Sequence, residues 1–433
     1  MKLATLIILL CFQTGILRTQ TLSEKSSGRD LIHLKQLKSE VYKNLTDNIL
    51  SYWTKNMVDP VNGGFYGRID YQEKKYPGDD KGGILNARIL WTFSSAYRVT
   101  KDTSYLSVAK RARDYILDHF IDQKYGGTYR SVTSKGVPSD IRKQTYSQSF
   151  FIYALSEYYR ATGDQDALNA AKEIYRLLEK HAVDPKSDGY FEVFDREWKR
   201  TNELLIGEKT SKDVKTMNTH LHMMEAYANL YRVWPDPKLA GRLKNLISLF
   251  TDKIIDPKSF HLNVFLDSNW QITSTLYSYG HDIEASWLLV EAAQILGDHS
   301  IIKNCETISL KIADAASQGL QPDGSLISEK DYSSGEVNTS RDWWPQAETI
   351  VGLLNAFELS NKEAYLNNAL KCWNYTNKYM VDHQSGEWFN AVSASGTVSK
   401  GDKAGFWKCP YHNGRMCIEV MERVSMLEKS NHP

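Results

Sequence analysis

The 433-residue sequence predicts an all-α fold, an (α/α)6 barrel of six inner and six outer helices with short β-hairpins on one face. Three observations predict it: a turn motif that recurs six times, charged amphipathic helices before the turns, and less polar helices after them. A repeat of this length indicates a closed or stacked array of supersecondary units. Six repeats with two kinds of helix favour a closed ring over the structural alternative, an open helical solenoid.

The repeated turns are rich in Asp, Asn, Pro and Gly, as in Asp-Pro-Val-Asn-Gly-Gly-Phe-Tyr and Asp-Gln-Lys-Tyr-Gly-Gly-Thr-Tyr. Their first residues are Asp59, Asp122, Asp184, Asp256, Gln321 and Asp382, at spacings of 63, 62, 72, 65 and 61. These residue types supply the backbone conformations that tight hairpins need. We therefore expect six hairpins, with equivalent positions of the repeats meeting at one end of the array.

The helices before the turns are expected on the outside. Their apolar residues recur at three- and four-residue spacing with Lys, Arg and Glu between them, which is typical of a helix with one solvated face. The clearest examples are residues 105–119, 166–181, 237–254 and 362–380.

The helices after the turns are expected on the inside. They carry fewer charges, are richer in Ala, Gly, Ser and aromatic residues, and are apolar around more of their circumference, as buried helices are. Their predicted ranges are 85–98, 144–160, 217–233, 278–296, 342–359 and 411–427.

Composition and charge limit the classes of function. The chain is 42% hydrophobic, and no linker rich in Pro, Gly or Ser interrupts the repeat, so residues 30–430 are expected to form a single domain. The net charge of +1 gives no electrostatic reason to expect nucleic acid as a partner. We expect a small-molecule substrate, no membrane association of the mature protein, and a monomer or weak homodimer.

The N-terminus predicts a signal peptide over residues 1–22. Lys2 precedes an apolar run of about ten residues, which is too short to anchor a protein in a bilayer. The prediction is therefore an exported protein, periplasmic or secreted. The alternatives are an apolar N-terminus of a cytosolic protein, or lipidation at Cys11, which the bulky Leu10 before it disfavours.

The inner helices begin with polar and aromatic residues that packing alone does not require. Several form i,i+3 or i,i+4 pairs on one helix face, and all occur at nearly the same phase of the repeat, so a closed ring would direct them to one centre. They are Arg88, Tyr146, Asn218, His222, His281, Glu284, Trp344, Glu348 and His412. Each residue alone could be an ordinary structural group, but the coincidence across six helices predicts an active site.

The chemistry suggested by this set is proton transfer without a metal or cofactor. The sequence has no His-Glu-X-X-His motif, no Gly-rich phosphate loop and no nucleophile elbow, and the four cysteines after the leader lack metal-type spacing. Imidazole moves protons near neutral pH. Two histidines on opposite walls could remove a proton from one face of a carbon and return one to the other. Glu284 is expected to orient His281, and Arg88 to stabilise an oxyanion.

Five segments, 82–91, 218–227, 280–289, 343–348 and 407–413, carry a family resemblance. They include Asn-Thr-His-Leu-His-Met-Met-Glu-Ala-Tyr, Gly-His-Asp-Ile-Glu-Ala-Ser-Trp and Trp-Lys-Cys-Pro-Tyr-His-Asn. They resemble the cellobiose 2-epimerases, within the wider N-acylglucosamine 2-epimerase family. The resemblance implies an (α/α)6 barrel and cofactor-free epimerisation at C2 of the reducing-end sugar of a β-1,4-linked disaccharide such as cellobiose or mannobiose.

The resemblance also implies a role for each residue. His281 and His412 resemble the two acid/base histidines, and His222 resembles a third that handles the ring oxygen or O1. The binding and orienting residues would be Arg88, Tyr146, Asn218, Glu284, Trp344, Glu348 and Trp407. A second sugar would stack on Trp388 or Trp407.

Four other functions stay open from the sequence. They are an N-acylglucosamine 2-epimerase, a mannose-type aldose–ketose isomerase, an (α/α)6 glycoside hydrolase that uses a carboxylate pair, and a non-catalytic sugar-binding protein.

Overall fold

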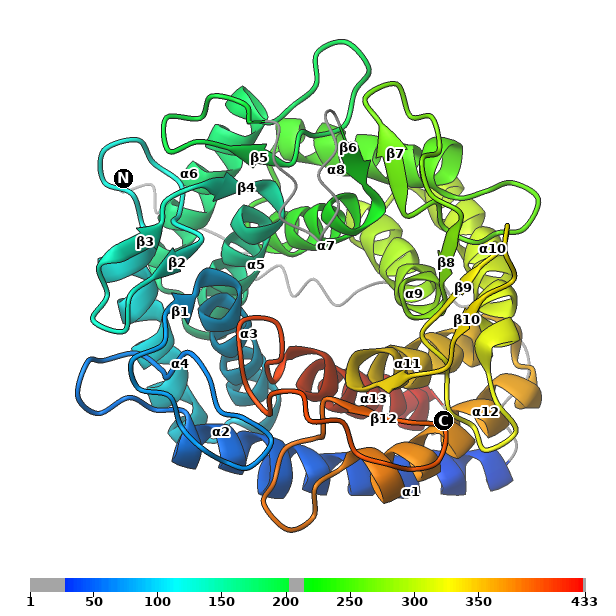
Figure 1. Cartoon of the computed structure of the whole chain (residues 1–433). Coiled ribbons are helices and arrows are strands. Elements are labelled where there is room, and N and C mark those ends of the chain that lie inside the picture. The colour runs from blue at the N-terminus through cyan, green and yellow to red at the C-terminus, as the bar shows by residue number, and fades with distance from the viewer. Residues whose placement is uncertain (1–27, 202–213, 431–433) are drawn as a thin grey trace, which may run out of the picture.

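The computed structural model describes residues 28–201 and 214–430, and the predicted signal peptide lies outside them. Six inner helices form a ring in which each packs against the next in chain order and the last packs against the first (Figure 1). The predicted barrel is therefore confirmed. The inner helices are α3 (Gly83–Thr100), α5 (Thr145–Thr162), α7 (Met217–Val233), α9 (Tyr279–Leu296), α11 (Trp343–Ser360) and α13 (Tyr411–Ser430).

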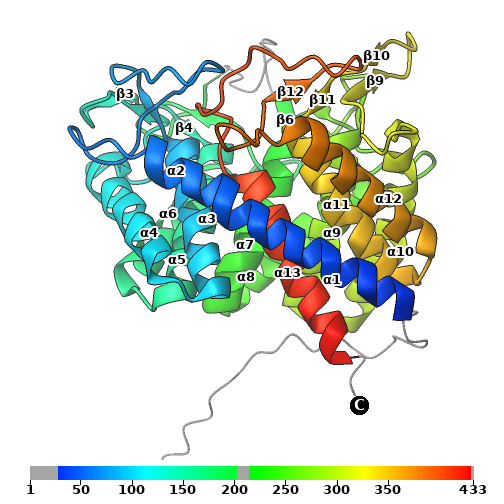
Figure 2. The same ribbon diagram turned by 90° about the horizontal axis from the view of Figure 1, so that it is seen from below.

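The outer helices surround this ring. Five are α4 (Thr103–Tyr115), α6 (Gln165–His181), α8 (Pro237–Leu249), α10 (His299–Ala316) and α12 (Glu363–Tyr375). The sixth is the start of the described chain, where α1 (Gly28–Lys43), a π-helical stretch η1 (Asn44–Leu50) and α2 (Ser51–Asn56) run on from one another. This helix packs across α13, the last inner helix (Figure 2). Because the two ends of the chain pair in this way, the ring is closed and the open solenoid is wrong.

Most outer helices begin at a capping aspartate, and most end in a π-helical or 3₁₀ turn. Asp102, Asp164, Asp236 and Asp298 each accept a hydrogen bond from a backbone N–H of the first helical turn, which stabilises the helix start. The last turns before the hairpins are η2 (Ile116–Phe120), η3 (Phe250–Ile254) and η5 (Thr376–Met380), which are π-helical, and η4 (Ser317–Gly319), which is a 3₁₀ turn.

All six predicted hairpins are present at one end of the barrel (Figure 2). In the first, Val58 pairs with Phe65, and the Asp59 carboxylate accepts the N–H groups of Val61 and Asn62. The buried Lys81 ammonium lies 2.8 Å from the same carboxylate. Equivalent lysine–aspartate pairs recur at Lys143–Asp122, Lys215–Asp184 and Lys403–Asp382. A turn signal in the sequence is thus also the place where each of these four hairpins is held to the barrel.

Short antiparallel strands join neighbouring repeats above the helices. A strand that leads into an inner helix pairs with a strand of the following repeat: β1 (Lys81–Gly82) with β2 (Ser131–Val132), β4 (Lys143–Gln144) with β5 (Val193–Phe194), β6 (Val214–Thr216) with β7 (Phe265–Asp267), β8 (Leu276–Ser278) with β9 (Glu329–Asp331), and β11 (Arg341–Asp342) with β12 (Ala391–Val392). β3 (Pro138–Asp140) and β10 (Val337–Asn338) extend two of these sheets. An isolated bridge between Ile69 and Ala404 joins the first repeat to the last.

Some polar residues at the inner-helix starts face the hairpins and not the centre of the ring. The Gln148 side-chain amide bonds both the N–H and the C=O of Thr128, each at 2.9 Å. The Nε2 atom of His220 accepts the backbone N–H of Tyr190 at 3.1 Å. Asp282 and Gln346 bind their own hairpins in the same way. These side chains anchor the hairpins, whereas the residues predicted for the site lie elsewhere on the same helices.

Candidate active site

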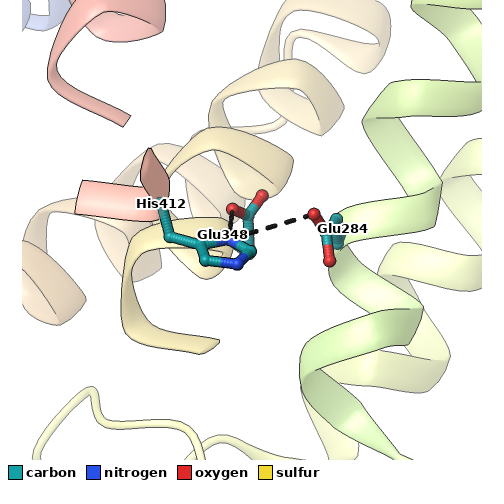
Figure 3. A group of neighbouring side chains, drawn as sticks. All are labelled: Glu284, Glu348 and His412. Atoms are coloured by element: carbon teal, nitrogen blue, oxygen red, sulfur yellow. Dashed lines mark hydrogen bonds and ion pairs between the residues drawn. The ribbon is translucent and has the colours of Figure 1, made fainter. Parts of the chain in front are cut away.

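His412 at the start of α13 is held by a carboxylate on its Nδ1 atom. The distance from Nδ1 to Glu348 Oε1 is 2.7 Å, and the nearest oxygen of Glu284 is 4.0 Å away (Figure 3). Glu348 also accepts the indole N–H of Trp287 at 3.0 Å. When Glu348 is ionised, the proton of the imidazole resides on Nδ1, and Nε2 keeps a free lone pair. That atom has no hydrogen-bond partner among the described residues.

Arg415 connects this carboxylate pair to the rest of the site. One amino group of its guanidinium lies 2.6 Å from Glu284 Oε1 and 2.7 Å from Glu348 Oε1. Its other amino group contacts the carboxylate of Glu225 and the hydroxyl of Tyr411. The Arg415 side chain is buried, as are the three carboxylates. A charge this deep in the protein is tolerated only when it is paired.

His222 has a carboxylate of its own. Its Nδ1 atom lies 3.0 Å from Glu225 Oε2, one turn further along α7. Burial acts to raise the pKa of Glu225, but Arg415 and His222 outweigh it and bring that pKa down to about 2. The ionised Glu225 therefore fixes the Nδ1–H tautomer of His222, as Glu348 does for His412.

His281 is oriented differently from the prediction. Its Nδ1 atom lies 2.7 Å from the hydroxyl of Ser278, the residue that precedes α9 by one position. Glu284 was expected to orient this ring, but its carboxylate is bound to Arg415 and lies next to His412 instead. The expectation was wrong because the i,i+3 spacing gives a shared helix face but not the direction of two side chains within it.

His281 and His412 do not stand on opposite walls. They lie on α9 and α13, and α11 stands between these helices in the ring (Figure 1). Trp344 of α11 lies beside both imidazoles, with its ring centroid 4.6 Å from that of His281 and 5.6 Å from that of His412. The expected opposition is wrong in geometry, yet the two histidines lie beside the same tryptophan.

Arg88 and Tyr146 form a second cluster beside His222. A guanidinium amino group donates to the Tyr146 hydroxyl at 2.9 Å, and the phenol ring lies 5.2 Å from the imidazole of His222. Burial raises the pKa of Tyr146 to about 12, so its hydroxyl keeps its proton. Arg88 also reaches the Trp407 carbonyl at 3.3 Å, and its Nε atom is buried without a partner among the described residues. The predicted Arg88, Tyr146 and His222 are thus brought together.

Of the two tryptophans considered for a second sugar, only Trp407 is available. Trp388 is fully buried, and its indole donates to Asn44 at 3.0 Å, so this expectation was wrong. Trp407 is 40% exposed, and its ring lies 5.9 Å from Tyr146. It also lines a rim pocket of about 570 Å³ that includes Asp79 and Asp402. None of the three site histidines, His222, His281 and His412, is among the residues that line this pocket.

Asn218 lies on the first turn of α7, as predicted. Its side-chain oxygen is buried without a partner among the described residues. A buried carbonyl oxygen that lacks a donor is costly unless a ligand supplies one. Asn218 is therefore a candidate acceptor for a sugar hydroxyl.

The environment holds the three histidines in their neutral form. Burial lowers the pKa of His281 to about 3 and that of His222 below its ordinary value. Burial, followed by the nearby Arg88 and Arg415, takes the pKa of His412 well below 6.5. Neutral imidazoles with a free nitrogen are general bases at physiological pH.

Glu284, Glu348 and His412 together offer donor atoms of the kind that hold a metal ion, all within 4.8 Å of one another. One amino group of Arg415, however, donates to an oxygen of Glu284 and to an oxygen of Glu348. A guanidinium in that position supplies the positive charge that a metal would bring and would repel a second cation. The residues present do not fit a metal site.

Sequence reasoning missed Arg415, Glu225, Tyr411 and Ser278. Arg415 and Glu225 each follow a predicted histidine by three residues, and Ser278 precedes one by three. The same helix-face spacing that selected the other pairs could have found them. The four cysteines that the structure describes are buried and unbonded to one another.

Comparisons with known proteins agree with this geometry. The family model described as N-acylglucosamine 2-epimerase (GlcNAc 2-epimerase) matches residues 64–414. The chain is 49% identical to the cellobiose 2-epimerase of Bacteroides fragilis over 386 residues, which cover 89% of this chain and 98% of that protein. The solved structure of the cellobiose 2-epimerase from Bacillus thermoamylovorans superimposes with a TM-score of 0.86 at 41% identity, covering 90% of this chain and 100% of that one.

A more distant relative is the human N-acylglucosamine 2-epimerase, with 23% identity over 395 residues, 87% of this chain and 88% of that protein. The family match covers most of the chain, and the more similar relatives cover nearly all of their own length. The chain belongs to the N-acylglucosamine 2-epimerase family.

Proposed function

We propose that this protein epimerises the reducing-end sugar of a β-1,4-linked disaccharide at C2, by proton transfer between histidines and without a cofactor. The observation that supports it most is the pairing of His222 and His412 with their own buried carboxylates. Each pairing leaves Nε2 free to accept a proton, and His412 is one of the two bases proposed to act at C2. The similarity to cellobiose 2-epimerases supports the disaccharide as substrate class.

The reaction begins with the open-chain aldehyde of the reducing-end sugar. The tautomer that Glu348 fixes makes His412 a base that can take the C2 proton, and His281, which also lies beside Trp344, is the second group. The electrons of the broken C–H bond move onto the aldehyde oxygen and give an enediolate. Positioned proton transfer of this kind contributes about 10² to 10⁴ in rate.

Arg88 and Tyr146 are the donors proposed for the enediolate oxygens. Both are buried beside His222, and both retain an N–H or O–H without a described partner. Donors fixed in a buried site stabilise developing negative charge more than water does. Rotation about C2–C3 then presents the other face of C2. Because both histidines rest in the neutral form, His412 releases to solvent the proton it has taken, and His281 takes one from solvent. His281 donates that proton to C2, and both histidines are neutral again.

A glycoside hydrolase is less compatible with the carboxylates. Such enzymes place two carboxyl groups about 5 to 9.5 Å apart with the glycosidic bond between them. Here Glu284 and Glu348 share one amino group of Arg415, so no sugar can enter between them. An N-acylglucosamine 2-epimerase or a mannose-type isomerase would use the same bases, and the choice of substrate separates them.

The function is tested by incubating the purified protein with cellobiose, β-1,4-mannobiose, N-acetylglucosamine and mannose, and separating the products by chromatography. We expect the C2 epimer of one or both disaccharides, with kcat/KM for the better disaccharide at least about tenfold above that for the monosaccharides. Turnover of N-acetylglucosamine alone, fructose formed from mannose alone, or release of glucose from cellobiose would each refute the proposal.

A further inference from the structure

Arg415 lies between two histidine–carboxylate pairs, and this position suggests a role beyond packing. One of its amino groups binds Glu348, the partner of His412. The other binds Glu225, the partner of His222. One buried cation thus contacts the carboxylates that fix two of the three histidines. A positioning role for this cation rests on the proposed epimerisation, in which His412 is one of the two bases.

The charges in this cluster do not balance if every carboxylate is ionised. Glu225, Glu284 and Glu348 surround a single guanidinium, and all four side chains are buried. Two carboxylates that share one donor in a low-dielectric site do not both ionise readily, so the pair keeps one proton. Glu284 and Glu348 are that pair, because their Oε1 atoms accept from the same amino group.

The hydrogen bonds indicate which of the two is ionised. Glu348 receives donors from Arg415, Trp287 and His412, whereas Glu284 receives only Arg415 among the described residues. Donors stabilise the charged form of a carboxyl group. Glu348 is therefore the anion and Glu284 the acid. The raised pKa of Glu284, about 8 and caused by burial and by Glu348, agrees with this assignment.

The place of that proton decides what His412 can do. With Glu348 ionised, Nδ1 of His412 donates and Nε2 is a base. With Glu348 protonated, its O–H would donate to Nδ1 and force the proton onto Nε2, which could then no longer accept the C2 proton. The two arrangements differ in the place of two protons, one on the carboxyl pair and one on the imidazole. The groups involved are close together, since Nδ1 is 2.7 Å from Glu348 and 4.0 Å from Glu284.

We propose that Arg415 is a positioning residue that keeps the negative charge on Glu348 and thereby holds His412 in its basic tautomer. Other charged or titratable groups near the guanidinium are Tyr411 on its own helix, His222 and Glu225 on α7, Glu284 on α9, Tyr153 on α5 and Arg88 on α3. Arg88 is the other cation of the site, and its hydrogen bonds are to Tyr146, Trp407 and Cys409, not to these carboxylates. Without Arg415, no described cation contacts Glu348 directly.

The test compares Arg415→Lys and Arg415→Met with a matched control on the same helix. Arg423 is also buried and paired with glutamates, at 2.7 Å from Glu358 and 3.1 Å from Glu419, at the other end of α13. We expect Arg415→Met to lower kcat by about 10² to 10³ with KM changed less than about threefold. Arg415→Lys, which keeps the charge but not the forked geometry, should lose about tenfold. Arg423→Lys should keep kcat.

The pH profile separates this role from a structural one. When Arg415 is replaced by Met, Glu348 holds its proton at higher pH, so the acid limb of kcat should move upward by about one unit or more, with Arg415→Lys in between. A loss of kcat with an unchanged acid limb would overturn the inference. So would an equal loss of kcat in Arg423→Lys.

A second measurement does not depend on activity. Long-range ¹H–¹⁵N spectra of the histidine-labelled protein distinguish the two tautomers, and the His412 signal is identified by its loss in His412→Gln. We expect Nδ1–H in the wild type and a shift toward Nε2–H in Arg415→Met, or a smaller shift in the milder Arg415→Lys if the Met variant does not fold. The same tautomer in all variants would contradict the proposal. Wild-type protein without epimerase activity, but with this tautomer shift, would refute the proposed function and not the role of Arg415.

Discussion

His220 and His222 stand two residues apart on α7, yet they serve different purposes. Nε2 of His220 accepts the backbone N–H of Tyr190 and holds a hairpin in place. His222 faces Glu225 and the ring of Tyr146 in the site. Residue type alone does not separate them. Their positions do, because a shift of two residues turns a side chain by about 200° around a helix of 3.6 residues per turn.

These two histidines allow a matched prediction. We expect His222→Gln, whose side-chain amide can still donate to Glu225, to lower kcat at least about tenfold while leaving the free energy of unfolding within about 1 kcal/mol. His220→Ala leaves the buried N–H of Tyr190 without its acceptor, so it should cost about 1 to 3 kcal/mol of stability and retain most of the specific activity of the folded fraction. Urea unfolding and initial rates measure both quantities. The reverse pattern would mean that the two residues have been assigned to the wrong sides of the helix.

The proposed bases lead to the strongest prediction at this scale. His281→Ala and His412→Ala should each lower kcat by about 10² to 10⁴, since each removes a group that transfers a proton. Both variants should still bind the disaccharide, because Arg88, Tyr146 and Asn218 remain. Calorimetric titration measures the binding. Near-normal turnover in either variant would rule out the two-base mechanism.

Much of the site could be predicted at the level of residues, and some could not. His222, Arg88 and Tyr146 were found because they recur at one phase of the repeat, and the structure brings them together. Glu284 was assigned to the wrong histidine, and Trp388 proved to be buried. Spacing along a helix gives the face of a residue, but the partner depends on the packing of other helices. No single-helix pattern reports that packing.

At the scale of the element, a buried lysine–aspartate pair holds each of four hairpins to the barrel, and the first hairpin is an example. Lys81 and Asp59 are both almost completely buried and pair at 2.8 Å, with the Lys81 ammonium also donating to the carbonyl of Gly63 at 2.6 Å. The Asp59 turn was predicted from its sequence, but its lysine partner was not. The partner lies 22 residues downstream, beyond a loop, and no spacing rule for a single turn or helix links the two residues.

The pair predicts a stability change. Lys81→Met should lower the free energy of unfolding by about 3 to 5 kcal/mol, because it leaves the Asp59 carboxylate buried without its cation. The double variant Asp59→Asn with Lys81→Met should recover part of the loss, since no charge is then buried. Lys400→Met at an exposed rim position is the control and should change stability by less than about 0.5 kcal/mol. Denaturant titration gives all three values, and equal effects at Lys81 and Lys400 would contradict this account of the hairpin.

At the scale of the molecule, the closed ring could be predicted but its closing contact could not. Six repeats favoured closure, and the structure confirms it. The contact that closes the ring is the packing of the chain's first described helix across its last, together with the bridge between Ile69 and Ala404. The repeat pattern carries no information on this contact, because the first outer helix precedes the first turn.

The buried acids and bases set the pH at which the whole molecule is most stable. Burial lowers the pKa of the four inner-helix histidines below 6.5, so below that pH the unfolded chain binds protons that the folded chain does not, and stability falls as pH falls. Burial raises the pKa of three buried glutamates above 4.5, Glu192, Glu284 and Glu348. Above that pH the folded chain keeps protons that the unfolded chain has lost, and stability falls as pH rises. The histidines are His220, His222, His281 and His412.

We therefore expect the free energy of unfolding to be greatest between about pH 4.5 and 6.5, where the two effects oppose each other. Each group contributes at most about 1.4 kcal/mol per pH unit. Glu192 offers a control away from the histidines: burial raises its pKa to about 7, and it accepts hydrogen bonds only from Thr216 and Thr219 among the described residues. Glu192→Gln should reduce the decline above pH 4.5. A maximum above about pH 7.5 in urea titrations would contradict these assignments.

The measurement that tests the central claim most directly is a proton NMR time course of the purified protein with cellobiose or β-1,4-mannobiose in D2O, with EDTA and no added cofactor. The account predicts the C2 epimer with deuterium at C2 and an intact glycosidic bond, because the proton removed by one histidine exchanges with solvent before another is returned. An epimer that retains its original C2 hydrogen throughout, loss of activity in EDTA, or cleavage to monosaccharides would contradict it.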